Sequence, residues 1–375
     1  MDPRHPADWL ALSLLPGLGP TSLTRLLEVL DDPAEIAFRV PAGMLSGGVR
    51  GACAAKIRRA RRDLRRRVDE EIRRARHAGV RIVPRDAPDY PVALLEIPDP
   101  PLLLYIRGEL PHHRPRIALV GSRAATRYGS GFALRIASEL TQAGFEVVSG
   151  GARGIDTAAH RGALEAGGRT VAVLGSGLQR PYPPENHALF DRISGCGALV
   201  SEFALTCPPS KSTFPQRNRV VSGLCAAVVV VEAAARSGAL ITARHALEQG
   251  REVLAVPGPA TSPRSAGANR LIQEGAKLVL GIEDILTELP PLYRPDPQAV
   301  PDSAKNPLDI SDLSEDERTV VGLLDEVEAI HADDLALAAP FDVARLQVAL
   351  FGLQLRGAVD LDPGRYYLLR PRREP

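Results

Sequence analysis

The feature that most constrains the fold is an alternation of short apolar runs and helical segments between residues 102 and 289. Most of the apolar runs end at glycine or serine, and segments with helical spacing separate them. Strands that alternate with helices indicate βαβ units and a mainly parallel sheet. Right-handed crossovers place the carboxyl ends of such strands at one edge, where open α/β sheets bind ligands. The sequence therefore predicts a Rossmann-like α/β domain with a ligand crevice.

The expected elements follow directly from this pattern. We expect strands at residues 116–120, 145–148, 170–174, 198–200, 226–231, 252–256 and 277–280. We expect helices at residues 129–143, 155–166, 237–249 and 267–274. The run of Ala and Val at 226–231 suits a strand that is buried on both faces.

The rest of the chain divides around this domain. Residues 1–100 have a mostly helical pattern, and residues 101–289 form the α/β domain. Residues 290–310 are rich in Pro, Asp and Ala, which is typical of a linker. Residues 311–375 read as a small helical unit with a terminal hairpin.

Charge is unevenly distributed along the chain. The formal net charge is only +1, yet residues 50–85 are strongly basic and residues 283–342 strongly acidic. This separation indicates that one part meets polyanions and another part does not. Lysine is rare, so Lys211 stands out as one of few placed ammonium groups.

Several classes of protein and site are disfavoured by composition. The four cysteines show no C-x-x-C spacing and no histidine cluster accompanies them, so we expect neither a metal site nor a disulfide framework. No run of 18 apolar residues occurs, and the N-terminus lacks the apolar core of a signal peptide. We therefore expect a cytoplasmic protein with no membrane partner.

Four strand ends carry small residues that would let the backbone approach a ligand. Two of them lead directly into helices, whose N-termini offer unpaired N–H groups and a positive dipole end. Together they predict a phosphate-binding crevice. The four strand ends are Gly121-Ser122-Arg123, Ser149-Gly150-Gly151-Ala152-Arg153-Gly154, Gly175-Ser176-Gly177 and Ser237-Gly238.

Nucleotide cofactors and acid–base catalysis are both poorly supported. The run that begins at Gly121 lacks the second and third glycines of G-x-G-x-x-G, and no Walker A motif occurs, so we expect no NAD or ATP. Asp156 and His160 stand at i and i+4, as an acid–base pair could. A carboxylate in a first helical turn more simply accepts local N–H groups, so we expect no catalytic residue.

A basic segment just before the buried strand extends the crevice. We expect residues 211–219 to form a loop at the same edge. Its cations suit phosphates, its amides can bond base edges, and its aromatic ring can stack on a base. The cations are Lys211, Arg217 and Arg219, the amides Gln216 and Asn218, and the aromatic residue Phe214.

Read together, these motifs resemble the DNA-processing protein A family (DprA, also called Smf). The resemblance covers nearly the whole middle domain in order. It implies a Rossmann-like homodimer that binds single-stranded DNA, protects incoming DNA and loads the RecA recombinase in natural transformation, without catalytic activity or a cofactor. The matching motifs are Ala118–Arg123, Ser149–Asp156, Ala172–Gly175, Tyr182-Pro183, Ser201-Glu202, Phe214–Arg219, Val230–Glu232, Ser237–Thr242 and Val256–Gly258.

The crevice and the resemblance together define an expected DNA-contacting set. It consists of Gly121, Ser122, Arg123, Ser149, Gly150, Gly151, Arg153, Lys211, Phe214, Gln216, Arg217, Asn218, Arg219, Ser237 and Gly238.

The flanking segments are less specific. Residues 14–23 are similar to a helix-hairpin-helix or SAM-like segment with Gly17 and Gly19 in the hairpin; phosphate contact and simple packing both stay open. Residues 58–76 read as a helix with a solvated basic face. Residues 311–375 look like a winged helix, with helices at 334–338 and 343–355 and a wing at 359–369. Its acidic character favours a packing or protein-contact role.

Two questions remain open at this level. Apolar residues at 271–272, 279–280 and 282–289 suit either a dimer interface or core packing. The alternative function is that of a nucleotide phosphoribohydrolase of the lysine-decarboxylase-like group, whose P-G-G-x-G-T segment corresponds here only to Ser237–Thr242 without a double glycine. A hydrolytic glutamate is hard to place, because Glu248 lies far along the following helix.

Overall fold

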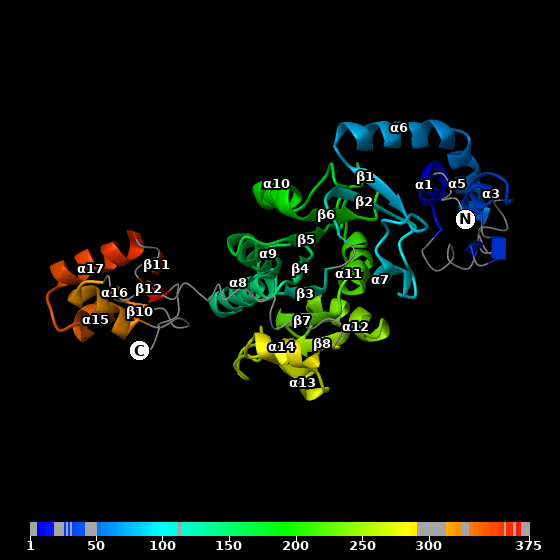
Figure 1. The fold of residues 1–375 in the computed structure, drawn as a ribbon. Coiled ribbons are helices and arrows are strands. Elements are labelled where there is room, and N and C mark those ends of the chain that lie inside the picture. Colours follow the sequence, from blue (N-terminus) through cyan, green and yellow to red (C-terminus); the bar gives the residue numbers. More distant parts are fainter. Residues whose placement is uncertain are drawn as a thin grey trace. The chain divides into compact units, whose positions relative to one another are not determined.

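The computed structural model describes residues 6–18, 26–27, 29–30, 32–41, 51–111, 114–290, 313–324, 330–355, 358–362 and 365–368 (Figure 1). The chain divides into two compact units, Met1–Val300 and Pro301–Pro375.

The first unit is built on a nine-stranded sheet in the order β1-β2-β6-β5-β4-β3-β7-β8-β9. β2 pairs antiparallel with both β1 and β6, and the remaining neighbours pair in parallel. The strand order reverses between β3 and β7, so these neighbours form the switch point of the parallel sheet. The strands are β1 (Arg81–Pro84), β2 (Leu103–Gly108), β3 (Arg116–Gly121), β4 (Glu146–Ser149), β5 (Thr170–Val173), β6 (Ala198–Ser201), β7 (Ala227–Glu232), β8 (Glu252–Ala255) and β9 (Lys277–Leu278).

Helices connect these strands and precede them at the N-terminus. Those before the sheet are α1 (Pro6–Ser13), α3 (Pro33–Phe38), α5 (Gly51–Arg61) and α6 (Leu64–His77). Those between or after the strands are α7 (Val92–Leu95), α8 (Arg127–Gln142), α9 (Ile155–Glu165), α10 (His187–Cys196), α11 (Thr213–Gly223), α12 (Ala239–Glu248), α13 (Ala266–Gln273) and α14 (Ile282–Glu288), with a 3-10 turn at Pro184–Asn186.

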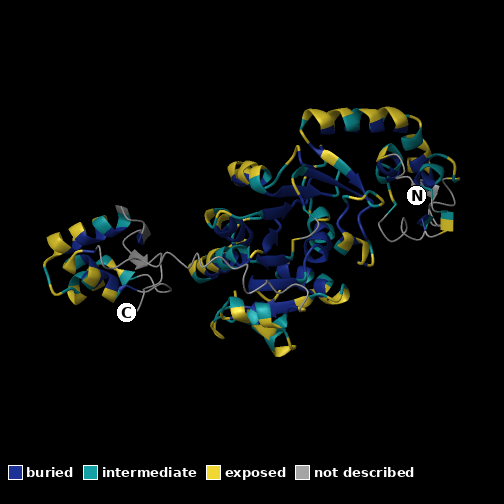
Figure 2. Cartoon of the chain, in the orientation of Figure 1, coloured by how far each residue is buried: buried dark blue, intermediate teal, exposed yellow. Residues whose placement is uncertain are grey.

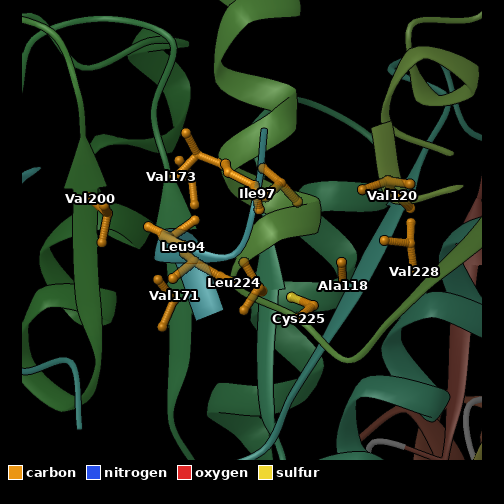
Figure 3. Packing of buried hydrophobic residues seen from close by; sticks show 14 of the residues in the cluster. Leu94, Ile97, Ala118, Val120, Val171, Val173, Val200, Leu224, Cys225 and Val228 are labelled. Carbon is orange, nitrogen blue, oxygen red and sulfur yellow. The ribbon is translucent and has the colours of Figure 1, made fainter. Parts of the chain in front are cut away.

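Alternation along the strands builds a three-layer core. In β3, Ile117 and Leu119 join the cluster covered by α8 and α9, whereas Ala118 and Val120 join the cluster covered by α7, α11, α12 and α13. Figure 3 shows part of the second cluster, where Leu94 and Leu224 lie close to strand residues. Both faces are therefore apolar, which explains the continuous Ala and Val run in β7. Figure 2 shows these strands as the buried centre of the unit.

The sequence located every parallel strand but not the two strands that open the sheet. All seven expected strands form, the last one only as the two residues of β9. β1 and β2 were not expected, and their pairing runs across residue 100, with Pro84 opposite Leu103. One hydrophobic cluster joins the N-terminal helices, through Trp9 and Leu64, to sheet residues such as Tyr105. The sheet thus continues into residues 1–100, for which the sequence predicted a mostly helical structure.

Two local expectations were wrong. Residues 213–219 belong to helix α11, not to a loop. Pro215 lies in the first turn of that helix, where its missing N–H is not needed, so the Phe-Pro pair does not break the helix. The basic segment 58–76 is two helices instead of one, because α5 ends at Arg61 and α6 begins at Leu64.

The second unit has its own core and a small sheet in the order β10-β12-β11. Its two expected helices form as α16 and α17, and a hairpin of β11 and β12 occupies the expected wing segment. The elements are α15 (Glu315–Leu323), β10 (Ile330–His331), α16 (Ala332–Ala338), α17 (Val343–Leu355), β11 (Val359–Asp362) and β12 (Arg365–Leu368).

Some expectations fall on residues outside the described ranges. The expected hairpin near the N-terminus is described only as far as Leu18, with Gly17 at a φ of +82°, and residues 19–23 lie outside. The linker lies outside as well, apart from Pro290. Among the described residues no single helix could span a membrane by length and composition, and α16 with α17 would pass only as a pair bent by 117°.

Candidate nucleic-acid interface

A crevice of about 520 Å³ lies where the strand order reverses. Its walls are the ends of β3 and β4, the loop after β7, and the first turns of α11 and α12. Ligands of open α/β sheets bind at such a switch point, because the loops that leave the two neighbouring strands diverge there. Gly121, Gly150, Ser237 and Gly238 line it, as the glycine and serine pattern predicted.

Helix α11 sorts the basic segment into two groups. Phe214, Arg217 and Asn218 line the crevice, since positions three and four apart share one helix face. Gln216 and Arg219 lie on the opposite face, around Glu202. A loop could have presented all of these side chains together, but a helix cannot.

Arg219 therefore lies outside the crevice, although the sequence placed it within. The residue is 2% exposed, and Nε lies 3.1 Å from a carboxylate oxygen of Asp99. A second ion pair joins it to Glu202, whose carboxylate also accepts a hydrogen bond from Gln216 at 3.4 Å. These contacts give Arg219 and Gln216 structural partners at a distance from the crevice.

Arg217 is the most unusual group in the crevice. It is 5% exposed, and within the described chain its Nε has no hydrogen-bond partner and its guanidinium forms no ion pair. Burial lowers its pKa to about 10, while the nearby Asp156 carboxylate opposes that shift. The group thus stays protonated at neutral pH, and an incompletely bonded buried cation is costly unless an anion joins it.

Gly150 makes room for this guanidinium. A Cβ at Gly150 would lie 1.7 Å from Nη1 of Arg217. Only glycine fits here without moving the arginine.

Two further cations enlarge the positive charge. Arg123 and Lys211 both line the crevice, and neither forms an ion pair with any described residue. The guanidinium carbon of Arg123 lies 4.8 Å from the centre of the Phe214 ring, a cation–π contact. Asp156 is the one carboxylate among the described lining residues, so positive charge prevails.

Asp156 and His160 have structural partners. Asp156 accepts the Ala152 N–H at 3.1 Å, as expected of a first-turn carboxylate, and burial raises its pKa. Nδ1 of His160 lies 2.8 Å from the Thr170 hydroxyl, and burial lowers the histidine pKa to about 3. His160 is fully buried, so it is neutral and remote from any ligand in the crevice.

Aromatic and charged side chains flank the crevice mouth. Arg153 lies 5.7 Å above the Tyr182 ring, and Tyr182 lies 6.0 Å from Phe214, at a tilted angle. Arg153 also forms an exposed ion pair with Glu185. The sequence singled out Tyr182 only as part of a motif; the signal for its position is the turn that follows β5.

Several expected residues support the backbone instead of lining the crevice. Ser149 is buried and donates to the Leu119 carbonyl at 2.6 Å. A Cβ at Gly151 would meet the Phe190 ring, and one at Gly175 would meet Phe214. The first N–H of α9 also has a protein partner, because the Ile155 N–H donates to the Ser122 carbonyl at 3.1 Å.

The glutamate that the hydrolase alternative requires is not found at the crevice. Glu248 ends α12, where it lies 3.9 Å from Arg244, and it does not line the crevice. Within the described ranges no group of three or more His, Cys, Asp or Glu gathers in a way that could hold a metal ion.

Sequence comparisons agree on one family. A model of the family described as DNA recombination-mediator protein A matches residues 81–290, starting at the first residue of β1. Protein Smf of Escherichia coli (strain K12) is 41% identical over 293 residues, which cover 77% of this chain and 77% of that protein. DNA processing protein DprA of Streptococcus pneumoniae (strain ATCC BAA-255 / R6) is 46% identical over 200 residues, or 53% of this chain and 71% of that protein.

Solved structures agree as well. The X-ray structure of DNA processing protein A from Streptococcus pneumoniae matches with a TM-score of 0.65 and 35% identity, over 76% of this chain and 98% of that chain. A structure of DNA processing protein A from Helicobacter pylori, described in terms of its single-stranded DNA binding mode, matches with a TM-score of 0.50 and 29% identity. That match covers 54% of this chain and 95% of that chain.

Proposed function

The chain belongs to the DNA recombination-mediator protein A family, and from that premise we propose that it binds single-stranded DNA in the crevice as a recombination mediator. The observation that carries this proposal is Arg217, a buried cation without a bonded partner in the described chain, at the switch point of the sheet. A backbone phosphate supplies the anion that this group lacks.

The neighbouring groups suit the same ligand. Arg123 and Lys211 can each meet a further phosphate, and Phe214 and Tyr182 offer rings against which unstacked bases can pack. The amide of Asn218, which donates to the Gly238 carbonyl at 3.3 Å, can turn to a base edge. Bases are free to stack on protein rings only in a single strand, so the site favours single strands over duplex.

We narrow the proposed contact set to residues that line the crevice or its mouth. We retain Gly121, Ser122, Arg123, Gly150, Arg153, Lys211, Phe214, Arg217, Asn218, Ser237 and Gly238, and we add Tyr182. Ser149 and Gly151 then shape the turn, whereas Gln216 and Arg219 stabilise the opposite face of α11.

The wider role is part of the same proposal. In it, the protein protects incoming DNA and loads RecA during natural transformation, as a cytoplasmic homodimer without catalytic activity. Exposed Leu280 supports a dimer surface after β9, whereas Val279, Ile285 and Leu289 pack in the core. The order of elements in the second unit supports its interpretation as a winged helix, and its acidic α15 supports a protein-contact role.

A salt-titrated binding assay tests the central proposal. We expect tighter binding to an oligothymidine than to a blunt duplex of equal length, with affinity that falls steeply as salt rises. Arg217→Met and Lys211→Ala should each weaken single-strand binding about tenfold and reduce the salt slope by about 0.7, the value for one lost phosphate contact. Arg244→Ala is a matched control, because Arg244 is an exposed cation that does not line the crevice.

Two results would contradict the proposal. One is unchanged single-strand affinity in the Arg217→Met and Lys211→Ala variants. The other is release of adenine from AMP by the purified protein, which would support the phosphoribohydrolase alternative instead.

A further inference from the structure

A second basic surface lies on α5 and α6, away from the crevice. We name it the basic face and define it by the exposed lysine and arginine residues of α5, of α6 and of the turn between them that make no ion pair or ring contact with any described residue: Lys56, Arg58, Arg59, Arg62, Arg73 and Arg76. Figure 2 shows most of α6 exposed on its outer side. The apolar face of α6, with Leu64, Val68 and Ala75, packs into the core of the unit.

Other charged residues of α6 already have protein partners, which distinguishes them from the cations of the basic face. Arg66 is equally exposed, yet it is paired with Asp63 at 3.1 Å and with Glu70 at 2.9 Å. Glu71 is buried and accepts the Leu205 N–H at 2.6 Å. Asp69 is then the exposed carboxylate that remains unpaired among the described residues of α6. Positive charge on the basic face is therefore largely uncompensated.

These cations also repel one another. Lys56 and Arg59 stand three residues apart in α5, and Arg73 and Arg76 stand three apart in α6, a spacing that brings helical side chains together. Like charges at this spacing destabilise a helix. A polyanion would relieve this repulsion, which the folded chain by itself leaves in place.

The chemistry of the basic face distinguishes its ligand from that of the crevice. Residues 54–77 contain no Phe, Tyr, Trp, Asn or Gln, so this segment itself supplies no aromatic ring on which a base could stack and no amide to read a base edge. Its arginine and lysine side chains suit the phosphates of a nucleic-acid backbone. Duplex DNA presents these at high density, about one charge per 1.7 Å of axis.

The position of the basic face also separates it from the crevice. β1, the strand that follows α6, lies five strand spacings from β3, or roughly 24 Å at about 4.8 Å per spacing. α6 itself is about 21 Å long at 1.5 Å per residue. We propose that the basic face is a second nucleic-acid site, which binds the phosphate backbone of duplex DNA independently of the crevice.

Binding of the full-length protein to a blunt 40-base-pair duplex and to a 40-nucleotide oligothymidine tests this proposal. The double variant Arg73→Gln with Arg76→Gln should lose about tenfold in duplex affinity and flatten the salt dependence by about two units, near 0.9 for each lost phosphate contact. Its oligothymidine affinity should not change. Its Tm should not fall, because the substitutions relieve repulsion.

Arg66→Gln is the matched control on the same helix, and it should keep duplex affinity since that arginine is already paired. Arg217→Met should weaken oligothymidine binding about tenfold and leave duplex affinity unchanged. A failure of the crevice proposal is therefore distinguishable from a failure of this one. The inference is overturned if the wild type does not bind duplex, if the double variant binds it normally, or if only oligothymidine affinity falls. A loss of self-association with normal duplex affinity would also overturn it, and would identify an acidic protein segment as the occupant.

Discussion

At the scale of single residues, the site depends on one close approach. Gly150 leaves the volume in which the Arg217 guanidinium lies, and Arg217 in turn lies near Asp156. A glycine in a βα turn is commonly explained by backbone conformation. Here the reason is the space that a side chain from another element needs.

Gly150→Ala should therefore act as a substitution of Arg217. The added methyl meets the far end of an adaptable side chain, so the protein should fold with little change in stability. The guanidinium must move, and we expect single-strand affinity to fall at least tenfold. Gly131→Ala in α8 is the control, because no atom lies within 4 Å of its Cβ. It should leave affinity unchanged and stabilise the helix by about 1 kcal/mol. Equal affinities in the two variants would contradict this account.

His160 should make stability depend on pH. Burial lowers its pKa from 6.5 to about 3 in the folded protein, so the unfolded chain binds the proton first as the pH falls. The stabilising contribution is complete above pH 6.5 and is lost between 6.5 and about 3. The free energy of unfolding should therefore fall by about 2 kcal/mol as the pH drops from 6.5 to 5. Urea unfolding of the wild type and His160→Gln measures this, and the variant should show the weaker pH dependence. Parallel curves would rule out His160 as the cause.

At the scale of elements, α11 decides which polar residues reach the crevice. Its helical period turns Phe214, Arg217 and Asn218 toward the crevice and Gln216 and Arg219 toward Glu202. The sequence contains the same period, but Phe214-Pro215 suggested a loop and so concealed it. The alternation of strands and helices was easier to read, because each parallel strand is apolar on both faces.

Substitutions of Arg217 and Arg219 should have opposite effects on stability and on DNA affinity, because the two side chains lie on opposite faces of α11. Arg219→Met leaves Glu202 buried without its closest cation, and we expect a loss of about 3 kcal/mol in unfolding free energy with normal single-strand affinity. Arg217→Met should lower affinity and change stability less. Denaturant titration and DNA binding of both variants separate the two roles. A loss of single-strand affinity in a folded Arg219→Met variant would instead indicate that Arg219 contacts DNA.

At the scale of the whole molecule, the two chain ends relate differently to the α/β sheet. The N-terminal helices share a hydrophobic cluster with β2 and β6, through Tyr105 and Leu199, and β1 is itself part of the sheet. The described core of the second unit consists of its own residues, among them Val320, Leu335 and Leu353.

Truncation should expose this difference. A chain that ends at residue 300 keeps the full sheet and crevice, and we expect it to fold with normal single-strand affinity. A chain that begins at residue 101 loses β1 and uncovers the shared cluster, and we expect it to be insoluble or to unfold at low denaturant. Circular dichroism and DNA binding of the two fragments test this. Stable folding of the second fragment would show that the sheet does not need the N-terminal segment.

The sequence by itself determined the α/β class, the parallel strands and the small residues at their ends, because local periodicity and turn chemistry carry that information. It could not determine the strand order, and hence that β3 and β7 are neighbours, because pairing depends on contacts between distant segments. It also could not separate Arg217 from Arg219, since only the packing of α11 decides which one is left without a partner. The position of the crevice at the sheet edge could thus be predicted from the sequence, whereas the identity of its buried, unpaired cation depends on the tertiary structure.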